Sequence, residues 1–465
     1  MIEFYSKYFK KNYSSKVGQL IYDLKRLLDL EKLEILDENK IVLDPTFKKN
    51  LSDEYWKDLN KVYNTLYAKE KELSSTLKKF INKKSENQRS DLKFIDTFAG
   101  CGGLSLGLKN AGFNPVYVNE IEPKFLETYY FNHDITLDNY YCGDIKNIAT
   151  DNELKIKYKN IDLIAGGPPC QGFSMANRQR LIDDPRNKLY KQFLDLLGTI
   201  RPKFFIMENV KGMMNKSDEI LQDFSTILGS EYSFEMKLLN AKDFGVPQNR
   251  ERVFVIGSKI NKISATEILN DIISSKDDFD DFKLKDALFG LPLLEPKRQK
   301  HAKGVENDKI GFKFKLSDKI QNDFTKNINQ NRVVKYVSNH TNRFNNERDI
   351  EIFSRLPQGC NSLHSSIKEI MPYANRNHIF KDKYFKLNEN DYSKTITSHM
   401  KLDCNMYIHP TQARGLSPRE AARVQTFPDD FIFMGANNTW YAQIGNAVPV
   451  KLAEVIGSKI AKYLI

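Results

Sequence analysis

One cysteine stands in a loop whose composition suits a nucleophile. Cys170 follows a strand-like apolar run at 161–165 and lies within the sequence Gly-Gly-Pro-Pro-Cys-Gln-Gly. The two prolines stiffen the backbone before the thiol, and the neighbouring glycines leave it uncrowded. A rigid loop at a strand end is how enzymes present a nucleophile, whereas an inert buried cysteine has no need of such a loop. We therefore predict that Cys170 is reactive.

An acid and two guanidinium groups follow later strand-like runs. Glu208 comes directly after the apolar run 204–207, where a carboxyl group held protonated can give a proton to a ring nitrogen. Arg250 and Arg252 alternate in the segment Gln-Asn-Arg-Glu-Arg at 248–252. As strand residues they would share one face and could hold a carbonyl oxygen or phosphates. A helix-initiating Glu-Asn pair and a solvated charge cluster are the plainer interpretations of the two patterns taken singly.

A glycine-rich turn points to a cofactor that contains a nucleoside. The segment 96–108 reads Asp-Thr-Phe-Ala-Gly-Cys-Gly-Gly-Leu-Ser-Leu-Gly-Leu, after a strand-like run and before a helix. Such a turn can serve a dinucleotide, the carboxylate of S-adenosylmethionine, or only a tight bend, and it is not a P-loop because no Gly-Lys-Ser/Thr follows. Glu120 ends the next strand-like run, where a carboxylate can accept hydrogen bonds from a ribose.

The elements that must position these residues alternate between strand and helix. Strand-like runs occur at 92–96, 116–118, 161–165, 204–207 and 253–256, and helical patterns at about 104, at 123–131 and at 189–200. This alternation predicts an α/β fold with a mainly parallel sheet. In such sheets ligands bind at the carboxyl ends of the strands, which is where each of the segments above lies.

Three regions are expected along the chain. Residues 1–90 have leucines at helical spacing and end in a polar linker, which predicts a helical N-terminal extension. Residues 91–283 and 436–465 should form the α/β domain that carries the segments above. Residues 284–435 lose the alternation and should form a smaller irregular domain.

Bulk composition narrows the class of protein. The 465 residues suit two or three domains, and the net charge of +11 favours a polyanionic partner without excluding a basic surface that binds nothing. The five cysteines are odd in number and none has CxxC spacing, so we expect neither a disulfide framework nor a metal site. A membrane-spanning run and a signal peptide are both missing from the sequence. A cytoplasmic protein is the simplest expectation.

Six ordered motifs resemble the DNA (cytosine-5)-methyltransferase family of bacterial restriction–modification systems. They are FAGCGG, PPCQ, ENV, QNRER, RGLSPREAARVQTFPDDF at 414–431 and QIGNAVP at 443–449, and the resemblance covers roughly 92–257 and 409–457. One departure is Val450, where the family usually has a second proline. The resemblance implies a Rossmann-like catalytic domain at 91–283 and 436–465 that depends on S-adenosyl-L-methionine, with a target-recognition domain at 284–435. It also places Asn446 in the cofactor pocket, so the last helix should pack back onto the N-terminal part of the sheet.

The resemblance also implies a role for each motif residue. Cys170 would attack carbon 6 of a flipped-out cytosine, Glu208 would act at ring nitrogen 3, Arg252 would bind the carbonyl at position 2, and Arg250 would place phosphate and active-site loop. The loop after Cys170 would contact duplex DNA through Ser174, Arg178 and Arg186. S-adenosylmethionine would be held by Phe98, Gly100, Gly102, Leu104, Glu120, Ile121, Asp144, Ile145, Pro168, Leu189, Asn446 and Ala447.

Three other functions compete with DNA methylation. A tRNA cytosine-5 methyltransferase of the same family would carry a Cys-Phe-Thr tripeptide, which this sequence lacks. An inactive DNA-binding relative would not need Cys170, Glu208 and Arg252 intact, and a nicotinamide-dependent oxidoreductase leaves PPCQ and ENV unexplained. We expect a monomeric modification enzyme whose cognate restriction endonuclease acts on the same site without direct contact. The recognition sequence is not readable, and water is the expected base for the carbon 5 proton.

Overall fold

The computed structural model describes residues 20, 24, 33–37, 40–43, 52–71, 91–133, 135–169, 189–261, 263–299, 307–316, 320–372 and 383–464. Contacts divide the chain into two compact units, residues 1–87 and 88–465. Among the described residues, no helix is both long enough and apolar enough to cross a membrane.

The first unit contains one long helix and a strand pair. Helix α4 (Asp53–Lys71) begins at Ser52, whose hydroxyl accepts the backbone N–H of Tyr55 at 3.2 Å. Two acidic residues in its first turn suit the positive end of the helix dipole, and Leu59 and Tyr63 are buried. The helix was predicted. The antiparallel pair β1 (Leu33–Asp37) and β2 (Lys40–Leu43) was not, so the prediction of a wholly helical extension is incomplete.

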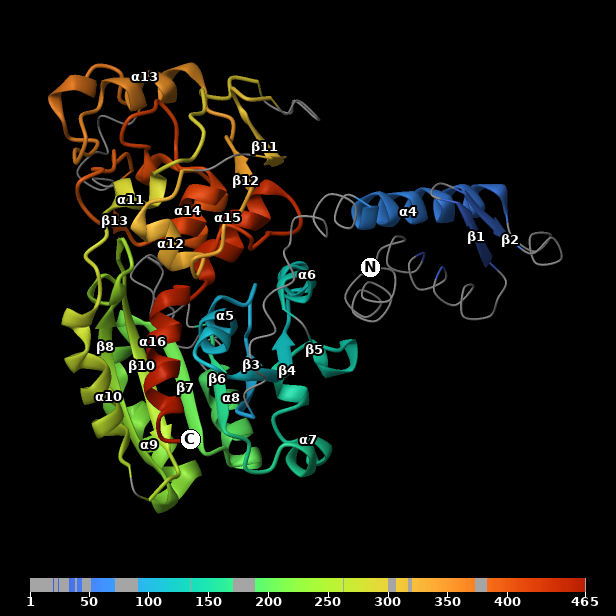
Figure 1. The fold of residues 1–465 in the computed structure, drawn as a ribbon, viewed down its shortest axis with the longest axis vertical. Helices are drawn as coiled ribbons and strands as arrows, with labels where there is room; N and C mark the ends of the chain where they lie inside the picture. Colours follow the sequence, from blue (N-terminus) through green and yellow to red (C-terminus); the bar gives the residue numbers. More distant parts are fainter. Residues whose placement is uncertain are drawn as a thin grey trace. The chain divides into compact units, whose positions relative to one another are not determined.

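The second unit is built on a seven-stranded sheet in the order β5-β4-β3-β6-β7-β10-β8 (Figure 1). Neighbours from β5 to β7 pair in parallel, whereas β10 is antiparallel to both β7 and β8. The predicted mainly parallel α/β sheet is therefore confirmed. The strands are β3 (Lys93–Thr97), β4 (Asn114–Glu120), β5 (Tyr140–Cys142), β6 (Leu163–Gly166), β7 (Phe204–Val210), β8 (Ser233–Asn240) and β10 (Glu251–Ser258).

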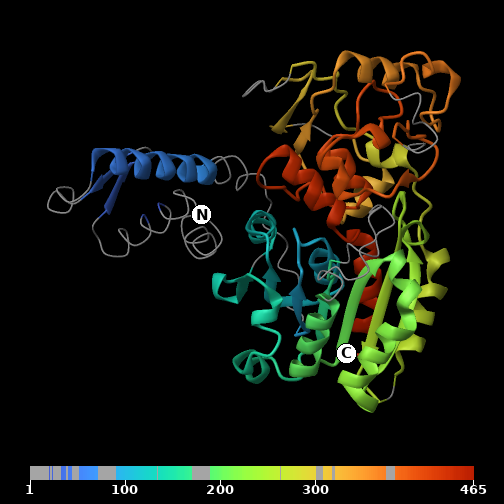
Figure 2. The same cartoon turned by 180° about the vertical axis from the view of Figure 1, so that it is seen from behind.

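Helices cover both faces of this sheet because successive strand residues point in opposite directions. Phe94 and Phe204 join one apolar cluster, which α5, α10 and α16 complete. Their chain neighbours Ile95 and Phe205 join a second cluster, which α7, α8 and α9 complete (Figure 2). The helices are α5 (Gly103–Asn110), α6 (Pro123–Asn132), α7 (Asn152–Lys157), α8 (Leu189–Ile200), α9 (Ser217–Leu228), α10 (Ala265–Ser274) and α16 (Val450–Ala461).

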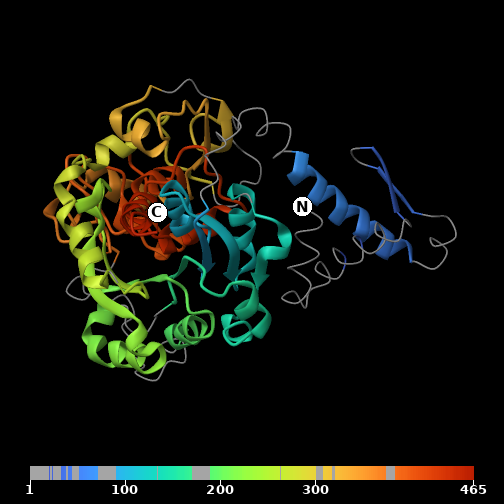
Figure 3. The same ribbon diagram turned by 60° about the horizontal axis from the view of Figure 1, so that its bottom comes forward.

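The C-terminal helix returns to the beginning of the sheet, as predicted. Helix α16 lies against α5 (Figure 3). The contact is close, because a Cβ atom added to Gly107 would lie 2.4 Å from the carbonyl oxygen of Val450 and 2.4 Å from the Cβ of Ala453. The side-chain amide of Asn110 also donates to the carboxylate of Glu454 at 3.1 Å. The last helix therefore supports the turn that precedes α5.

Between β10 and α16 the chain forms short elements around a third apolar cluster. They are α11 (Leu284–Leu288), β11 (Gly311–Leu316), α12 (Asp323–Ile328), β12 (Tyr336–Thr341), α13 (Glu347–Arg355), β13 (Ser393–Lys394), α14 (Pro418–Val424) and α15 (Asn437–Asn446). Strand β13 pairs in parallel with β9 (Gln248–Asn249), which comes just before β10. Many 3₁₀ turns connect them, for example Ser398–Lys401. The loss of regular alternation was predicted; the boundaries 284–435 remain a prediction.

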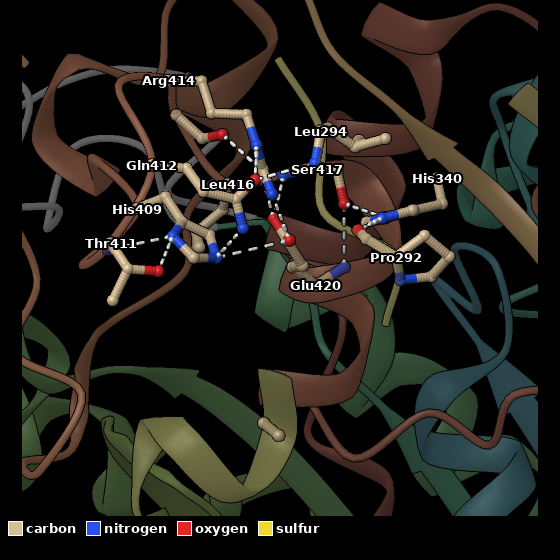
Figure 4. A network of polar contacts seen from close by, with 12 residues as sticks. Pro292, Leu294, His340, His409, Thr411, Gln412, Arg414, Leu416, Ser417 and Glu420 are labelled. Carbon is tan, nitrogen blue, oxygen red and sulfur yellow. Dashed lines mark hydrogen bonds and ion pairs between the residues drawn. The ribbon is translucent and has the colours of Figure 1, made fainter. Parts of the chain in front are cut away.

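Helix α14 is buried although its sequence is highly charged. Arg414 forms two hydrogen bonds with the carboxylate of Glu420, at 2.7 and 2.6 Å, and the same carboxylate accepts the backbone N–H of Ser417 (Figure 4). His340 bonds to the Ser417 hydroxyl at 2.8 Å, and His409 lies 3.6 Å from Glu420. Buried charges persist only when they are paired in this way. The paired groups fix the start of α14, and through it the end of α14.

Candidate active site

The predicted site residues lie along one edge of the sheet. The carboxyl ends of β5, β4, β3, β6 and β7 meet at the same edge because these strands are parallel, and antiparallel β10 begins there, with Arg252 opposite Val210. Read across the sheet, the edge carries Asp144, Glu120, Phe98, Pro168, Glu208 and Arg252. Residues predicted to bind the cofactor therefore lie at the ends of β5, β4, β3 and β6. Glu208 and Arg252 lie beside them at the same edge, on β7 and β10.

The turn after β3 has an unusual backbone. Phe98, Gly100 and Gly102 have φ angles of 53°, 58° and 93°, which lie in the left-handed region that favours glycine. A Cβ on Gly102 would lie 2.3 Å from Nε2 of His133, so only glycine fits there. At Gly100 an added Cβ would meet no described atom within 4 Å. The turn therefore leaves open space above Gly100, at the start of α5.

Glu120 joins this turn to the end of β4. One carboxylate oxygen accepts the N–H of Gly100 at 2.7 Å, and the other accepts the N–H of Glu122 at 2.8 Å. Burial raises the pKa of Glu120, while the backbone donors oppose that rise. Each oxygen keeps further acceptor capacity. The next side chain, Ile121, is 60% exposed, so an apolar surface lies beside the carboxylate.

The remaining predicted cofactor residues occupy different environments. Asp144 caps a 3₁₀ turn by accepting the N–H of Lys146 at 3.0 Å. The side chains of Ile145 and Leu104 are buried in apolar clusters, so only their backbones can face a ligand. Leu189 is the first residue of α8 and is half-buried. Asn446 is the last residue of α15 and is exposed, and Ala447, which follows it, is half-buried.

The end of α15 also approaches the glycine-rich turn. A Cβ on Gly103 would lie 3.0 Å from the Cβ of Ala447 and 2.8 Å from the carbonyl oxygen of Val448. Ala447 is thus brought beside a turn that is more than three hundred residues earlier in the sequence.

A buried chain of hydroxyl groups beneath the turn was not predicted. Ser105 donates to the Asp96 carboxylate at 2.5 Å, and its oxygen lies 2.5 Å from the hydroxyl of Tyr129. The other Asp96 oxygen has no hydrogen-bond partner among the described residues. Burial raises the pKa of Asp96 to about 7. The feature of the sequence that could have indicated this group is Asp96, at the end of the first strand-like run. Its partners Ser105 and Tyr129 could not be predicted from the sequence.

Glu208 and Arg252 form the second half of the site. Arg252 Nε lies 3.1 Å from Glu208 Oε1, and both side chains are nearly buried. That oxygen accepts no aligned hydrogen bond from any described residue. A Cβ on Gly167 would lie 3.2 Å from the other oxygen, Oε2. The glycine before the two prolines therefore makes room for the carboxyl group, which is aimed at the strand end leading to Cys170.

The backbone before the predicted nucleophile is anchored by the neighbouring strand. Asn209 donates its side-chain amide to the carbonyl of Pro168 at 3.0 Å. Cys170, Ser174, Arg178 and Arg186 themselves lie outside the described residues.

Two other cysteines lie in surroundings that do not suit a nucleophile. Cys101 and Cys404 are both buried, and burial raises the pKa of each thiol, to about 11 for Cys404. A thiol with a raised pKa is a poor nucleophile, because the thiolate is the reactive form.

Arg250 differs from its predicted partner. It lies between β9 and β10 and is 1% exposed, with donors to the carbonyls of Ile396 at 2.7 Å and Ala447 at 3.0 Å. Burial and the positive charge of Arg252 lower its pKa to about 9, so it remains charged near neutrality. Its contacts are with backbone carbonyls, and Arg252 alone lies against Glu208. The predicted role of Arg250, to place phosphate and the active-site loop, stays a prediction.

Comparisons with known proteins identify the family that this chain resembles. The model of the C-5 cytosine-specific DNA methylase family matches residues 92–462. The type II methyltransferase M.DdeI of Desulfomicrobium norvegicum is 32% identical over 392 residues, which cover 80% of this chain and 89% of that protein. M1.HphI of Haemophilus parahaemolyticus is 31% identical over 384 residues, covering 80% and 87%.

A solved structure has the same fold. The crystal structure of a candidate DNA modification methyltransferase encoded within an E. coli prophage superimposes with a TM-score of 0.61 at 27% identity, covering 80% of this chain and 99% of that one. The superposition leaves out about a fifth of this chain. The N-terminal unit, which lies outside the family match, is about that size.

Proposed function

The chain belongs to the C-5 cytosine-specific DNA methylase family, and from this premise we propose that it methylates carbon 5 of one cytosine in a specific duplex DNA sequence, with S-adenosyl-L-methionine as the methyl donor. The observation that carries this proposal is the Glu208–Arg252 pair, which lies at the sheet edge one strand away from the Pro-Pro-Cys segment. A family whose model describes DNA methylases favours DNA over tRNA as the substrate.

The residues at β7 and β10 would activate the target ring. Carbon 5 of cytosine is a poor nucleophile until a thiolate adds at carbon 6, and Cys170 would supply that thiolate. Glu208 would protonate or hydrogen-bond ring nitrogen 3, and Arg252 would bind the carbonyl at position 2, stabilising the charge that addition creates. Once carbon 5 carries the new methyl group, loss of its proton to water would expel Cys170 as a thiolate.

The residues at β3, β4 and β5 fit an S-adenosylmethionine molecule. Open space lies above Gly100, a carboxylate stands at the end of β4, and Ile121 offers an exposed apolar surface beside it. The open space at the start of the helix suits the polar tail of the cofactor, the carboxylate suits its ribose hydroxyls, and the apolar surface suits its flat base. The bound cofactor would supply an electrophilic methyl group; Glu120 and Ile121 would orient its nucleoside. Asn446 and Ala447 would close the pocket from the end of α15.

The target base must leave the DNA stack, which costs a few kcal/mol. The basic segment after Cys170, with Ser174, Arg178 and Arg186, would repay part of this cost by binding phosphates. Likeness to type II methyltransferases supports modification of a restriction site. The protein would act as a monomer, and a separate endonuclease would recognise the same site without direct contact.

Trapping with 5-fluorocytosine tests the mechanism directly. The purified protein is mixed with labelled S-adenosylmethionine and duplex DNA that contains 5-fluorocytosine at varied sites. Fluorine cannot leave as a proton does, so we expect a covalent protein–DNA adduct that carries the labelled methyl group and is lost in Cys170→Ala. Label bound to the protein without any adduct, on every DNA tried, would contradict the proposed covalent chemistry.

A further inference from the structure

Three buried side chains form a junction between the two halves of the site. Gln248 and Arg250 come from the segment that leads into β10, and Gln425 caps the end of α14. Their exposed fractions are 0%, 1% and 0%. Gln248 Nε2 donates to Gln425 Oε1 at 2.8 Å. Two glutamines and an arginine therefore share one interior volume, which is costly unless their polar groups are paired.

The side chains of Gln248 and Arg250 both bind the backbone of a single residue, Ile396, in the region between β10 and α16. Gln248 Oε1 accepts the N–H of Ile396 at 2.7 Å, and Arg250 Nη1 donates to its carbonyl at 2.7 Å. Ser393 and Lys394 pair in parallel with Gln248 and Asn249. Side chains at alternate positions of the extended segment thus continue the ladder beyond the strand. Arg252, two residues further on, lies at Glu208.

The third side chain holds the loop at the end of α15. Gln425 Nε2 donates to the carbonyl of Ile444 at 2.8 Å and to that of Ala447 at 3.0 Å. Arg250 Nη2 donates to the same Ala447 carbonyl at 3.0 Å and more weakly to that of Gly445 at 3.4 Å. A planar guanidinium fixes the directions of the carbonyls it binds. Among the described residues Arg250 Nε has no hydrogen-bond partner, but the other donors and acceptors named here are paired, and a buried network with this many bonds is rigid.

We infer that Gln248, Arg250 and Gln425 are positioning residues that hold the Gly445–Ala447 loop at a fixed place relative to the Arg252–Glu208 pair. This rests on the proposed function, in which that loop closes the cofactor pocket and that pair binds the cytosine. Methyl transfer requires the donor and the target carbon in line at near contact distance, and a displacement of about 1 Å can cost about 10²-fold in rate. The junction supplies the rigid connection that this alignment needs.

The two glutamines should give different kinetic signatures. Gln425 holds the cofactor side, so Gln425→Met should lower methyl transfer at saturating cofactor and DNA by about 10²-fold while it leaves ring activation unchanged. Ring activation is measured without cofactor, as tritium released to water from [5-³H]cytosine DNA by reversible thiolate addition and proton exchange. Gln248 holds the target side, so Gln248→Met should lower both rates.

The controls separate this inference from simple destabilisation and from the proposed function itself. Gln443→Met removes another buried amide, which donates to Met434 at 3.1 Å and does not reach the junction; it should keep both rates. Gln425→Glu, which retains volume but loses the donor, replaces Gln425→Met if that variant does not fold. Equal losses in Gln425→Met and Gln443→Met, or wild-type transfer by Gln425→Met, would overturn the inference. A wild-type protein inactive in both assays would instead refute the proposed function.

Discussion

At the scale of single residues, three buried carboxyl groups at one sheet edge have distinct surroundings. Glu120 is bound by two backbone N–H groups, Asp96 by a serine hydroxyl, and Glu208 faces a guanidinium while one oxygen takes part in no hydrogen bond with a described residue. Environment rather than residue type decides what each carboxyl can do. Among the described residues, Glu208 is a carboxyl with an unpaired oxygen that lies one strand from the Pro-Pro-Cys segment.

Replacing Glu208 tests its role as the acid. Glu208→Gln keeps the shape of the side chain but cannot release a proton, so we expect the methylation rate to fall by a factor on the order of 10²–10⁴. Single-turnover methylation of duplex DNA measures it. Glu251→Gln is the matched control, because Glu251 is a more exposed carboxylate on the same strand as Arg252 and pairs with Lys211. A Glu208→Gln enzyme with wild-type rates would remove the proposed acid.

Asp96 should make stability fall as the pH rises. Its pKa is raised by burial from 3.8 to about 7, so between these values the folded protein binds more protons than the unfolded one. The free energy of unfolding then drops by about 3 kcal/mol from pH 5 to pH 8 through this group. Asp96→Asn cannot titrate and should lack this component. Urea unfolding of both proteins at the two pH values measures the difference; identical pH dependences would contradict it.

At the scale of elements, the site depends on helices that pack against the segments that carry the site residues. Helix α5 begins at the glycine-rich turn and is held from behind by α16, where Gly107 leaves no room for a side chain. Helix α14 ends at the junction and is fixed at its start by Arg414 and Glu420. The contact of α5 with α16 joins segments more than three hundred residues apart, so a local change in packing there should reach the cofactor turn.

Gly107→Ala should destabilise the protein although alanine favours helix. In an open helix interior this substitution gains up to about 1 kcal/mol. At Gly107 the new methyl group would lie 2.4 Å from the Val450 carbonyl oxygen, and such overpacking costs about 1–3 kcal/mol. Thermal unfolding of Gly198→Ala is the control, because the nearest atom there is the end of the Ile227 side chain, which is 38% exposed and can move. A stabilised Gly107→Ala would disprove the close contact.

At the scale of the whole molecule, the protein combines a parallel sheet that carries the site with a buried polar network in the region beyond β10. Burial lowers the pKa of His340 to about 4 and that of His409 to about 3. Both rings are therefore neutral near pH 7, and the contact of His409 with Glu420 is not an ion pair. These groups give stability the opposite pH dependence to that of Asp96.

Acid should weaken the network through the two histidines. A histidine whose pKa is 6.5 unfolded and about 4 folded contributes stability that is complete above pH 6.5 and is lost as the pH falls. For His340 the loss between pH 7 and pH 5 is about 2 kcal/mol. His340→Gln keeps a donor and an acceptor for Pro292 and Ser417 but does not titrate. Urea unfolding should show a smaller acid loss in this variant, and an equal loss would contradict the assignment.

The first unit should be dispensable for the chemistry. The family match begins at residue 92, and contacts divide the chain between residues 87 and 88. A protein of residues 88–465 should therefore keep the melting temperature and the methylation rate at saturating DNA. Rates measured over a range of DNA concentrations would reveal any contribution of residues 1–87 to binding. A large drop in the saturated rate would show that this unit takes part in catalysis.

The sequence by itself determined the elements and the family. Apolar runs and helical spacing are local, so the strands at 92–96 and 204–207 and the helix at 189–200 were predicted close to their observed bounds, and short motifs predicted the chemistry. It did not show β8, the antiparallel placement of β10 or the strand pair in the first unit.

Only the tertiary structure decided which polar groups meet. Gln248 and Gln425 are 177 residues apart yet share a hydrogen bond, and Arg250 binds a carbonyl 197 residues away. Asp96 and Tyr129 likewise meet only through Ser105. Such partners leave no periodic trace, because each depends on how separate elements pack and not on the residues beside it. The tertiary structure therefore separated Arg250, which holds the backbone, from Arg252, which lies at Glu208.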